Sequence, residues 1–415
     1  MIKIRKYNNT IVQLISVLYI ITIVILMMDK VDNFPFGNIL RKIKYIYLLV
    51  VVSYFISTFR GKISAKVAGL LYLLILHTVL FGCILINTSV KTLTYQHFRE
   101  MMIYIGMVTF TYFFVWNEKI FYDFMKWNYW GIAFVLLWCG ITHFSHFVNP
   151  LYFIYVFSGS HAYRTTFGLG HANFTGNMCV FALIYSVFLL DEIRGNCSYL
   201  NLFKMKSTRW IILVDLIIVE MLFSTQSRTS IIAGIVFITV YVYYHWEEVF
   251  GFSNKLRFIV TILVMLIVIA FLIGEGASSV WSNSNRDANV TVNYPIFKQF
   301  SAWTGMGYIP SSGFFTNAYG LNTFALDIYY LYIFFTTGYV GSSIMLLFLC
   351  YSFFSIVKIL DKRKKELTMA LFMAILFTGI GQTNMISYTL LPSMINWIII
   401  FWAISPEYLD RRLNK

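Results

Sequence analysis

The sequence predicts an all-α, polytopic integral membrane protein with about twelve transmembrane helices, forming a single transmembrane domain over residues 1–415. Composition is the first observation behind this prediction. Hydrophobic residues make up 59% of the chain and charged residues only 12%, whereas soluble domains average about a quarter charged residues. The second observation is that apolar runs of about 17–25 residues, the length that crosses a bilayer, recur along the chain. The aromatic content of 19% also suits a lipid-facing surface with aromatic belts at its edges.

The predicted helices follow these apolar runs in order from the N-terminus. They cover residues 11–28, 44–59, 67–87, 101–116, 127–143, 173–190, 210–225, 229–246, 258–273, 328–357, 368–387 and 390–404. The tenth is long and carries Gly338 and Gly341, so we expect a half-helix, a break and then a full crossing. No small-residue cleavage site follows the first run, so we interpret it as retained.

The distribution of lysine and arginine predicts that both termini are cytoplasmic. Of the 32 basic residues, 22 lie in segments that this orientation places inside and 10 in segments that it places outside. This is the bias that the positive-inside rule describes. The basic cluster 362–365 is the strongest inside signal, and the basic residues within 41–44 are the exception. Three notable segments then face outward: 144–172, 224–228 and 274–327.

Composition also disfavours several classes of site. The net charge is +14, but the positive charge lies in short loops between apolar runs, so it does not indicate nucleic-acid binding. The five cysteines form no CxxC pair and four lie within apolar runs, so we expect neither a disulfide framework nor a thiolate metal site. Four histidines fall near one outer segment, but HxxH alone is a weak zinc signal and we predict no metal. These histidines are His143, His146, His161 and His171.

The outer segment 274–327 is longer than nearly every other outer connection. Long loops without structure are uncommon unless they are functional. Within it, 295–303 has apolar residues at helical spacing and Pro295 suited to a first turn, which predicts a short amphipathic helix. Its apolar positions are Ile296, Phe297, Phe300 and Trp303. Arg286 precedes this helix and Asp327 follows it. An ordinary surface loop is the alternative interpretation.

Two shorter outer segments place arginines near the start of predicted helices. Arg228 lies at the start of the eighth helix, where a cation is unfavourable because the first turn already presents positive partial charge. Free backbone N–H groups and an arginine at such a position together form an anion site. Ser227 directly precedes it. Arg164 lies before the sixth helix in a similar way. An arginine that reaches lipid headgroups is the alternative for Arg228.

The residues between Arg164 and the sixth helix add further candidates. Gly168 and Gly170 permit a close approach of the backbone to a ligand. Asn173 is a candidate N-cap, which is the commoner role for asparagine at a helix start. His171 is either a donor to substrate or a hydrogen-bonded structural histidine.

Three acidic residues are candidates for chemistry. Asp215 and Glu220 lie inside the seventh predicted helix, and acids within a membrane are functional candidates. Glu220 lies two turns below Arg228 and is placed to pair with one of the arginines. A proton relay, as in a transporter, and a neutral carboxyl bonded to a neighbouring Ser, Tyr or His are the alternatives. Asp327 opens the tenth helix and is either an N-cap or a general base beside an anionic leaving group.

The order of these motifs resembles the O-antigen ligase/polymerase family, which contains Wzy-type polysaccharide polymerases and WaaL-type ligases. The motifs are Arg164…Gly-x-Gly-His-Ala-Asn173, Ser-x-x-Ser-Arg228, Arg286…Trp303-x-Gly-x-Gly307, and Asp327-x-x-Tyr-Leu331…Gly338-x-x-Gly341. The resemblance covers residues 160–345, and the flanking helices match in hydropathy only. Ligases carry a His followed by Asn where this sequence has Asp327-Ile328, which argues against the ligase branch.

The resemblance implies a fold related to the GT-C glycosyltransferases and sugar chains carried on undecaprenyl diphosphate, without a metal or other cofactor. The family's matching arginines are thought to hold the diphosphate, which gives this role to Arg164, Arg228 and Arg286. We expect Asp327, or as second choice His171, to take the proton. Ser227, Asn173 and Glu220 are the supporting residues.

On this basis we expect a polysaccharide polymerase of the bacterial cytoplasmic membrane with an outward-facing active site. It would join lipid-linked repeat units into capsule, exopolysaccharide or O-antigen. A chain-length regulator and a flippase of the same pathway are candidate partners, and nucleic acid is not. The alternatives are an O-antigen ligase and a lipid-linked oligosaccharide flippase or other secondary transporter, whose sites should lie near the midplane. A structural membrane scaffold is the third class.

Overall fold

The structure, a computed structural model, describes residues 9–28, 42–58, 63–86, 91–115, 118–147, 164–194, 205–246, 259, 262, 290–307, 315–316, 322–323, 328–386 and 391–405. Most of these residues are helical, which confirms the all-α prediction at that level, and one small β-hairpin is added. The chain divides into two compact units. Unit 1 comprises Met1–Gly61, Phe110–Phe153 and Ala162–Ser227, and unit 2 comprises Lys62–Thr109, Ile154–His161 and Arg228–Lys415.

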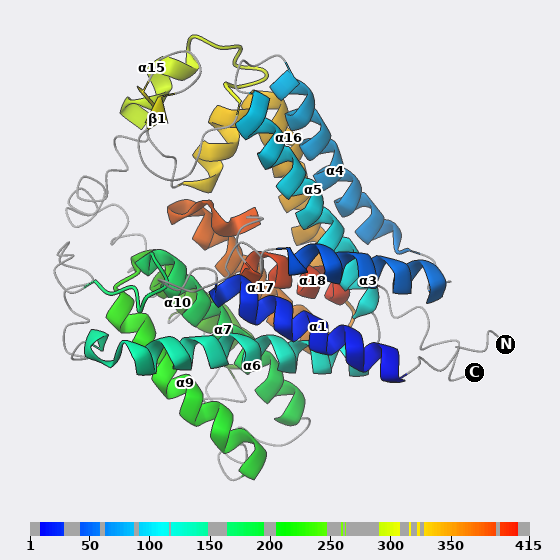
Figure 1. Cartoon of the computed structure of the whole chain (residues 1–415), viewed down its shortest axis with the longest axis vertical. Coiled ribbons are helices and arrows are strands. Elements are labelled where there is room, and N and C mark those ends of the chain that lie inside the picture. The colour runs from blue at the N-terminus through cyan, green and yellow to red at the C-terminus, as the bar shows by residue number, and fades with distance from the viewer. Residues whose placement is uncertain are drawn as a thin grey trace. The chain divides into compact units, whose positions relative to one another are not determined.

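Unit 1 is a helical bundle in which α6 has neighbours on several sides (Figure 1). Its helices are α1 (Asn9–Met28), α3 (Ile43–Thr58), α6 (Glu118–Thr142), the 3-10 turn η1 (Phe144–His146), α7 (Ala172–Arg194) and α9 (Lys206–Thr225). Helix α6 packs against α1, α7 and α9, while α7 also packs against α9 and α3 against α1. Helix α7 therefore packs on both α6 and α9, the helices after which the predicted outer motifs of this unit begin.

Buried polar bonds tie the apolar helices of unit 1 together. The Tyr19 hydroxyl donates to Asn128 Oδ1 over 2.7 Å and joins α1 to α6. The Tyr129 hydroxyl donates to Asp215 Oδ1 over 2.8 Å and joins α6 to α9. Because apolar side chains alone specify helix register weakly, such bonds between polar side chains help to fix how the helices pack.

Unit 2 contains the remaining described elements. Its helices are α4 (Ala65–Ile86), α5 (Lys91–Phe114) up to Thr109, α10 (Arg228–Tyr244), α15 (Asn293–Phe297), α16 (Tyr329–Val357), α17 (Lys362–Gly381), η3 (Thr383–Ile386) and α18 (Leu391–Ile404). The strands β1 (Phe315–Thr316) and β2 (Asn322–Thr323) pair antiparallel. Helix α10 packs against α17, and α16 packs against both α4 and α17 (Figure 1).

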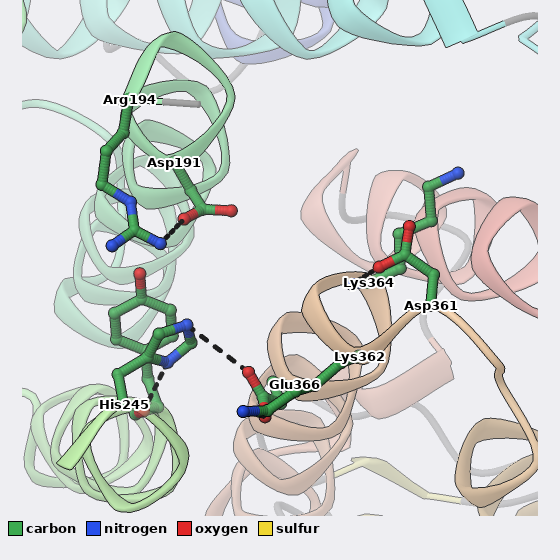
Figure 2. Close-up of polar contacts among 8 residues, drawn as sticks. Asp191, Arg194, His245, Asp361, Lys362, Lys364 and Glu366 are labelled. Carbon is green, nitrogen blue, oxygen red and sulfur yellow. Dashed lines mark hydrogen bonds and ion pairs between the residues drawn. The ribbon is translucent and has the colours of Figure 1, made fainter. Parts of the chain in front are cut away.

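An acid–base contact joins His245, directly after α10, to α17, as Figure 2 shows. His245 Nε2 lies 3.5 Å from Glu366 Oε2, and both side chains are buried. The other ring nitrogen of His245 lies 3.0 Å from the carbonyl oxygen of Tyr241. A carbonyl only accepts, so this nitrogen carries a proton and the imidazole is held in one orientation. Lys362 Nζ lies 3.9 Å from Glu366 Oε1 and adds positive charge beside the same carboxyl.

One helix end in each unit is stabilised by a side chain, through an N-cap in α17 and an ion pair in α7. Asp361 is the N-cap of α17, and its carboxylate accepts a hydrogen bond from the backbone N–H of Lys364 over 3.1 Å (Figure 2). In unit 1, Arg194 lies 3.3 Å from Asp191 in the last turn of α7 (Figure 2). A cation in the last turn also complements the helix dipole.

Helix α16 is broken at Gly338, which confirms the predicted interruption of the tenth helix. Gly338 has φ 62° and ψ −160°, a conformation that favours glycine. The loop that follows α15 supplies the hydrogen bonds that the break removes. Met306 and Gly307 donate to the carbonyls of Phe335 and Thr336, and Tyr339 and Val340 donate to the carbonyls of Ala302 and Trp303. The 302–307 loop and α16 thus share one backbone network.

Several predicted boundaries need correction. Helix α5 begins at Lys91 rather than near 101, and α6 at Glu118 rather than near 127, because the polar residues before each apolar run also form helix. Helix α17 ends at Gly381 rather than near 387, since Gln382 is extended. The amphipathic helix predicted within 274–327 has only five residues, Asn293–Phe297. The predicted ninth helix, 258–273, falls almost wholly outside the described residues.

The predicted apolar face of that outer helix is confirmed in part. Ile296 and Phe297 are buried and pack with Met306 and Phe335. Trp303, by contrast, is 68% exposed and contacts Tyr339 edge-on, because the helix has ended before it.

Two helices among the described residues are long and apolar enough to cross a membrane, Ala172–Arg194 and Tyr329–Val357. Shorter apolar helices cover Tyr45–Ile56, Ala65–Leu80, Arg228–Tyr244 and Leu391–Ile404. These helices are compatible with a membrane protein, and the count of twelve crossings stays a prediction.

Candidate functional site

Two of the predicted outer motifs meet in unit 1. Thr165, next to Arg164, bonds to the carbonyl of Ser224 in two ways: its hydroxyl donates over 2.9 Å and its backbone N–H over 3.4 Å. Ser224 lies in the last turn of α9, and Thr165 lies in the segment that leads to α7. The segments 164–171 and 224–227 are therefore held side by side.

Asn173 connects the two segments through its side chain. Its Oδ1 accepts a hydrogen bond from Arg164 Nη2 and a second from Ser227 Oγ over 3.2 Å. Helix α7 begins at Ala172, so Asn173 lies within the first turn. The interpretation of Asn173 as the N-cap is therefore wrong, and its amide instead orients the guanidinium of Arg164. Sequence separation hid this contact, because Asn173 and Ser227 are 54 residues apart.

His171 takes the place at the helix start that was expected for Asn173. Its Nδ1 accepts a hydrogen bond from the backbone N–H of Asn173 over 3.2 Å, which is the pattern of a side-chain cap. Its carbonyl accepts from the backbone N–H of Thr175 over 3.1 Å. Desolvation by the surrounding protein, and then the Arg164 cation, lower the pKa of the His171 imidazole from its ordinary value. The side chain nevertheless keeps a solvent-exposed edge.

Both segments contain a non-glycine residue in the left-handed conformation, which the sequence analysis missed. Phe167 and Gln226 each have φ 50°, and no other described non-glycine residue has positive φ. Such residues cost about 1–3 kcal/mol each and cluster at functional sites. Gln226 is 3% exposed, and its Oε1 has no hydrogen-bond partner among the described residues. No sequence signal marks these positions, because neither residue type favours positive φ strongly.

Gly168 is required by a close approach in the same region. It has φ 74°, and a side chain there would meet the His143 ring at 2.4 Å. The His143 ring lies 5.1 Å from that of His146, which in turn lies 5.9 Å from Phe167. These two histidines thus pack against Phe167 and Gly168 of the 164–171 segment. Among the described residues, no group of three or more His, Cys, Asp or Glu is arranged to hold a metal ion.

The remaining candidates stand as follows. Arg228 is the first residue of α10 and follows Ser227 directly, which confirms its predicted position at a helix start. Glu220 is partly buried in α9, and among the described residues no ion pair joins it to an arginine. Arg286, Asp327 and His161 lie outside the described residues. Asp215 is bonded to the Tyr129 hydroxyl, as expected if a neighbouring hydroxyl holds it.

No protein-family model matches this chain, and no curated protein matches it at a significant level.

Proposed function

We propose that this protein is a polysaccharide polymerase that joins oligosaccharide repeat units carried on undecaprenyl diphosphate. The observation that carries the proposal is the Asn173 bridge, which links Arg164 to Ser227 and so unites two of the motifs on which the family resemblance rests. An arginine oriented by a fixed amide is suited to bidentate contact with phosphate oxygens. Arg228 begins the next helix, where free backbone N–H groups also favour an anion.

The proposed reaction is a glycosyl transfer between two lipid-linked substrates. A hydroxyl at the nonreducing end of one unit attacks the anomeric carbon of the growing chain, and a new C–O bond forms. The bond from that carbon to the diphosphate oxygen breaks, and its electron pair leaves with undecaprenyl diphosphate. Asp327 takes the hydroxyl proton. The anomeric configuration inverts if the displacement is direct.

The arginines supply the electrostatic part of this mechanism. Negative charge develops on the leaving diphosphate, and fixed cations and donors stabilise it more than they stabilise the ground state. Arg164, Arg228 and Arg286 are assigned this role. Three guanidinium groups can balance the charge that a metal ion balances in other phosphate-transferring enzymes.

A membrane location is supported by the exposed surfaces of the helices. Ile56 on α3 is 74% exposed, Leu216 on α9 is 65% exposed and Leu346 on α16 is 62% exposed. Soluble monomers rarely expose large apolar patches, and lipid tails cover such residues without cost. We propose that the chain is a multi-pass protein of the bacterial cytoplasmic membrane with its active site outside.

A second candidate function, secondary transport, is favoured by one observation. Asp215 lies within α9, and intramembrane carboxyls commonly serve proton or ion coupling. The carboxyl is, however, bonded to Tyr129, whose hydroxyl also contacts the backbone of Ile211. A carboxyl bonded to a tyrosine that also contacts the backbone of the same helix fits a helix–helix contact better than a transport site that must change partners.

The test of the proposal uses purified protein in nanodiscs. Lipid-linked repeat units are extracted from a strain that lacks this protein and incubated with it, and chain length is resolved on gels. Products longer than the input units support a polymerase. Movement of units across vesicles without any lengthening would refute it in favour of a transporter.

A further inference from the structure

The start of α7 carries two side chains whose acceptor atoms are already engaged. His171 Nδ1 accepts from the backbone N–H of Asn173 over 3.2 Å. Asn173 Oδ1 accepts from Arg164 and from Ser227. A backbone N–H and a guanidinium can only donate, so the atoms that face them must be acceptors. The ring tautomer and the amide orientation are therefore fixed by the chemistry of their partners.

These contacts leave donor atoms available on both side chains. A neutral imidazole that accepts at Nδ1 carries its proton at Nε2, and an amide whose oxygen is engaged presents its NH2 group. Among the described residues, neither His171 Nε2 nor Asn173 Nδ2 has a hydrogen-bond partner. His171 is exposed and Asn173 is partly exposed, so both donors are open to a ligand.

We infer that His171 and Asn173 are neutral hydrogen-bond donors to the diphosphate of the lipid-linked substrate, beside the Arg164 guanidinium, and that His171 is not the general base. The identity of this substrate rests on the proposed function. The three side chains offer donors with no open acceptor, which suits an oxygen-rich anion. A sugar hydroxyl that must lose its proton needs an acceptor instead, so the base lies elsewhere.

The lowered pKa of His171 agrees with this assignment. A neutral ring keeps the Nδ1 lone pair for the helix start, whereas a protonated ring would break that bond. A base would need the lone pair to face the substrate. In the structure the lone pair instead faces the backbone N–H of Asn173 in the first turn of α7.

Two substitutions of His171 separate the donor, base and structural roles. Glutamine places an NH2 group near the position of Nε2, and asparagine places an oxygen near the position of Nδ1. A donor role predicts that His171→Gln keeps most polymerisation, while His171→Asn loses about a hundred-fold or more. A purely structural cap predicts the reverse order, because asparagine caps helices well. A base predicts equal loss in both, about a hundred- to ten-thousand-fold. Either of the last two results would overturn the inference.

A binding assay tests the site without the polymerase reaction. Purified wild-type protein is titrated with undecaprenyl diphosphate, undecaprenol and inorganic pyrophosphate. A separate titration with phosphatidylglycerol nanodiscs tests whether the phosphate of an ordinary lipid headgroup binds the same site. We expect undecaprenyl diphosphate to bind at least ten-fold more tightly than undecaprenol or phosphatidylglycerol. Pyrophosphate alone should compete weakly, because it lacks the lipid. Equal binding of undecaprenol and its diphosphate would overturn the anion site.

Asn173→Asp is the most direct variant for this assay. The carboxylate still accepts from Arg164 and Ser227, so the local fold is kept or strengthened, but the NH2 donor becomes a negative oxygen. We expect diphosphate affinity to fall about ten- to hundred-fold, while Gln299→Glu, an exposed amide-to-acid change in the outer loop, leaves it unchanged. Unaltered affinity in Asn173→Asp would refute the donor role even if the protein polymerises. If the wild-type protein does not polymerise but Asn173→Asp still lowers its affinity for undecaprenyl diphosphate, the anion site is upheld and the proposed function is rejected.

Discussion

Replacement of Gly338 by alanine should release the outer loop from the break in α16. Gly338 has φ 62° and ψ −160°, a region that is almost confined to glycine, and a side chain there costs about 1–3 kcal/mol in backbone strain. Its Cβ would lie 2.5 Å from the Ala302 carbonyl oxygen and 2.6 Å from the Gly305 nitrogen. Backbone atoms cannot turn aside as a side chain can, so overpacking adds a further 1–3 kcal/mol or so.

The expected cost of the substitution is about 2–6 kcal/mol in total, and it acts against the four hydrogen bonds that join the loop to α16. Such bonds are worth about 0.5–1.5 kcal/mol each, so the loop should detach before the helices unfold. Hydrogen exchange followed by mass spectrometry reads this directly on peptides that cover 301–307 and 334–341. Each 1.4 kcal/mol raises the exchange rate of these amides about ten-fold.

The matched control is Gly379→Ala in α17. Its nearest neighbour is the Tyr330 ring at 3.1 Å, a side chain that can shift by a few tenths of an ångström. Exchange in the 301–307 peptide should then stay close to wild type. If Gly338→Ala exchanges no faster than this control, the reasoning about the break is refuted.

Four further predictions address the chemistry and the packing. Asp327→Asn should fold and bind substrate yet lose about a hundred- to ten-thousand-fold in rate; near-normal polymer in the chain-length assay would mark it as a cap. Arg228→Lys keeps the charge but loses the planar fork, so polymer should fall strongly at normal protein level, and full activity would mean that the side chain only reaches headgroups. Polymerisation should persist in excess chelator, and its restoration by added divalent metal would contradict this. His245→Ala removes the imidazole partner of the buried Glu366 and should lower unfolding free energy by about 3 kcal/mol in a denaturant titration; an unchanged midpoint would show that Lys362 alone suffices.

Hydropathy predicted the helices well because apolar runs and helices coincide where a chain is buried or in lipid. It failed at the ends of α5 and α6, since the polar residues 91–100 and 118–126 are helical without being apolar. The break at Gly338 was predictable because glycine inside a long helix signals an interruption. Its partner, the 302–307 backbone, was not, because no periodicity records which loop completes a broken helix.

The candidate site was predictable in its members but not in their roles. Arg228 was singled out because a cation at the start of a helix is unfavourable, and the structure confirms that it begins α10. The exchange of roles between Asn173 and His171 could not be seen in the sequence, since both residue types serve as caps and as donors. Phe167 and Gln226 carry no signal at all, because left-handed backbone in such residues is imposed by their surroundings.

On the proposed membrane topology, the break in α16 also sets the depth of the 302–307 loop. Of the 29 residues of α16, nine precede Gly338 and nineteen follow it. At 1.5 Å per residue the first part is about 13 Å long and the second about 28 Å, so only the second approaches the thickness of a bilayer core. On the membrane topology that we propose, the first part dips in and stops. The 302–307 backbone, which is hydrogen-bonded to α16 at the break, then lies at the depth of the acyl chains, where polar backbone groups must be satisfied by protein rather than by water.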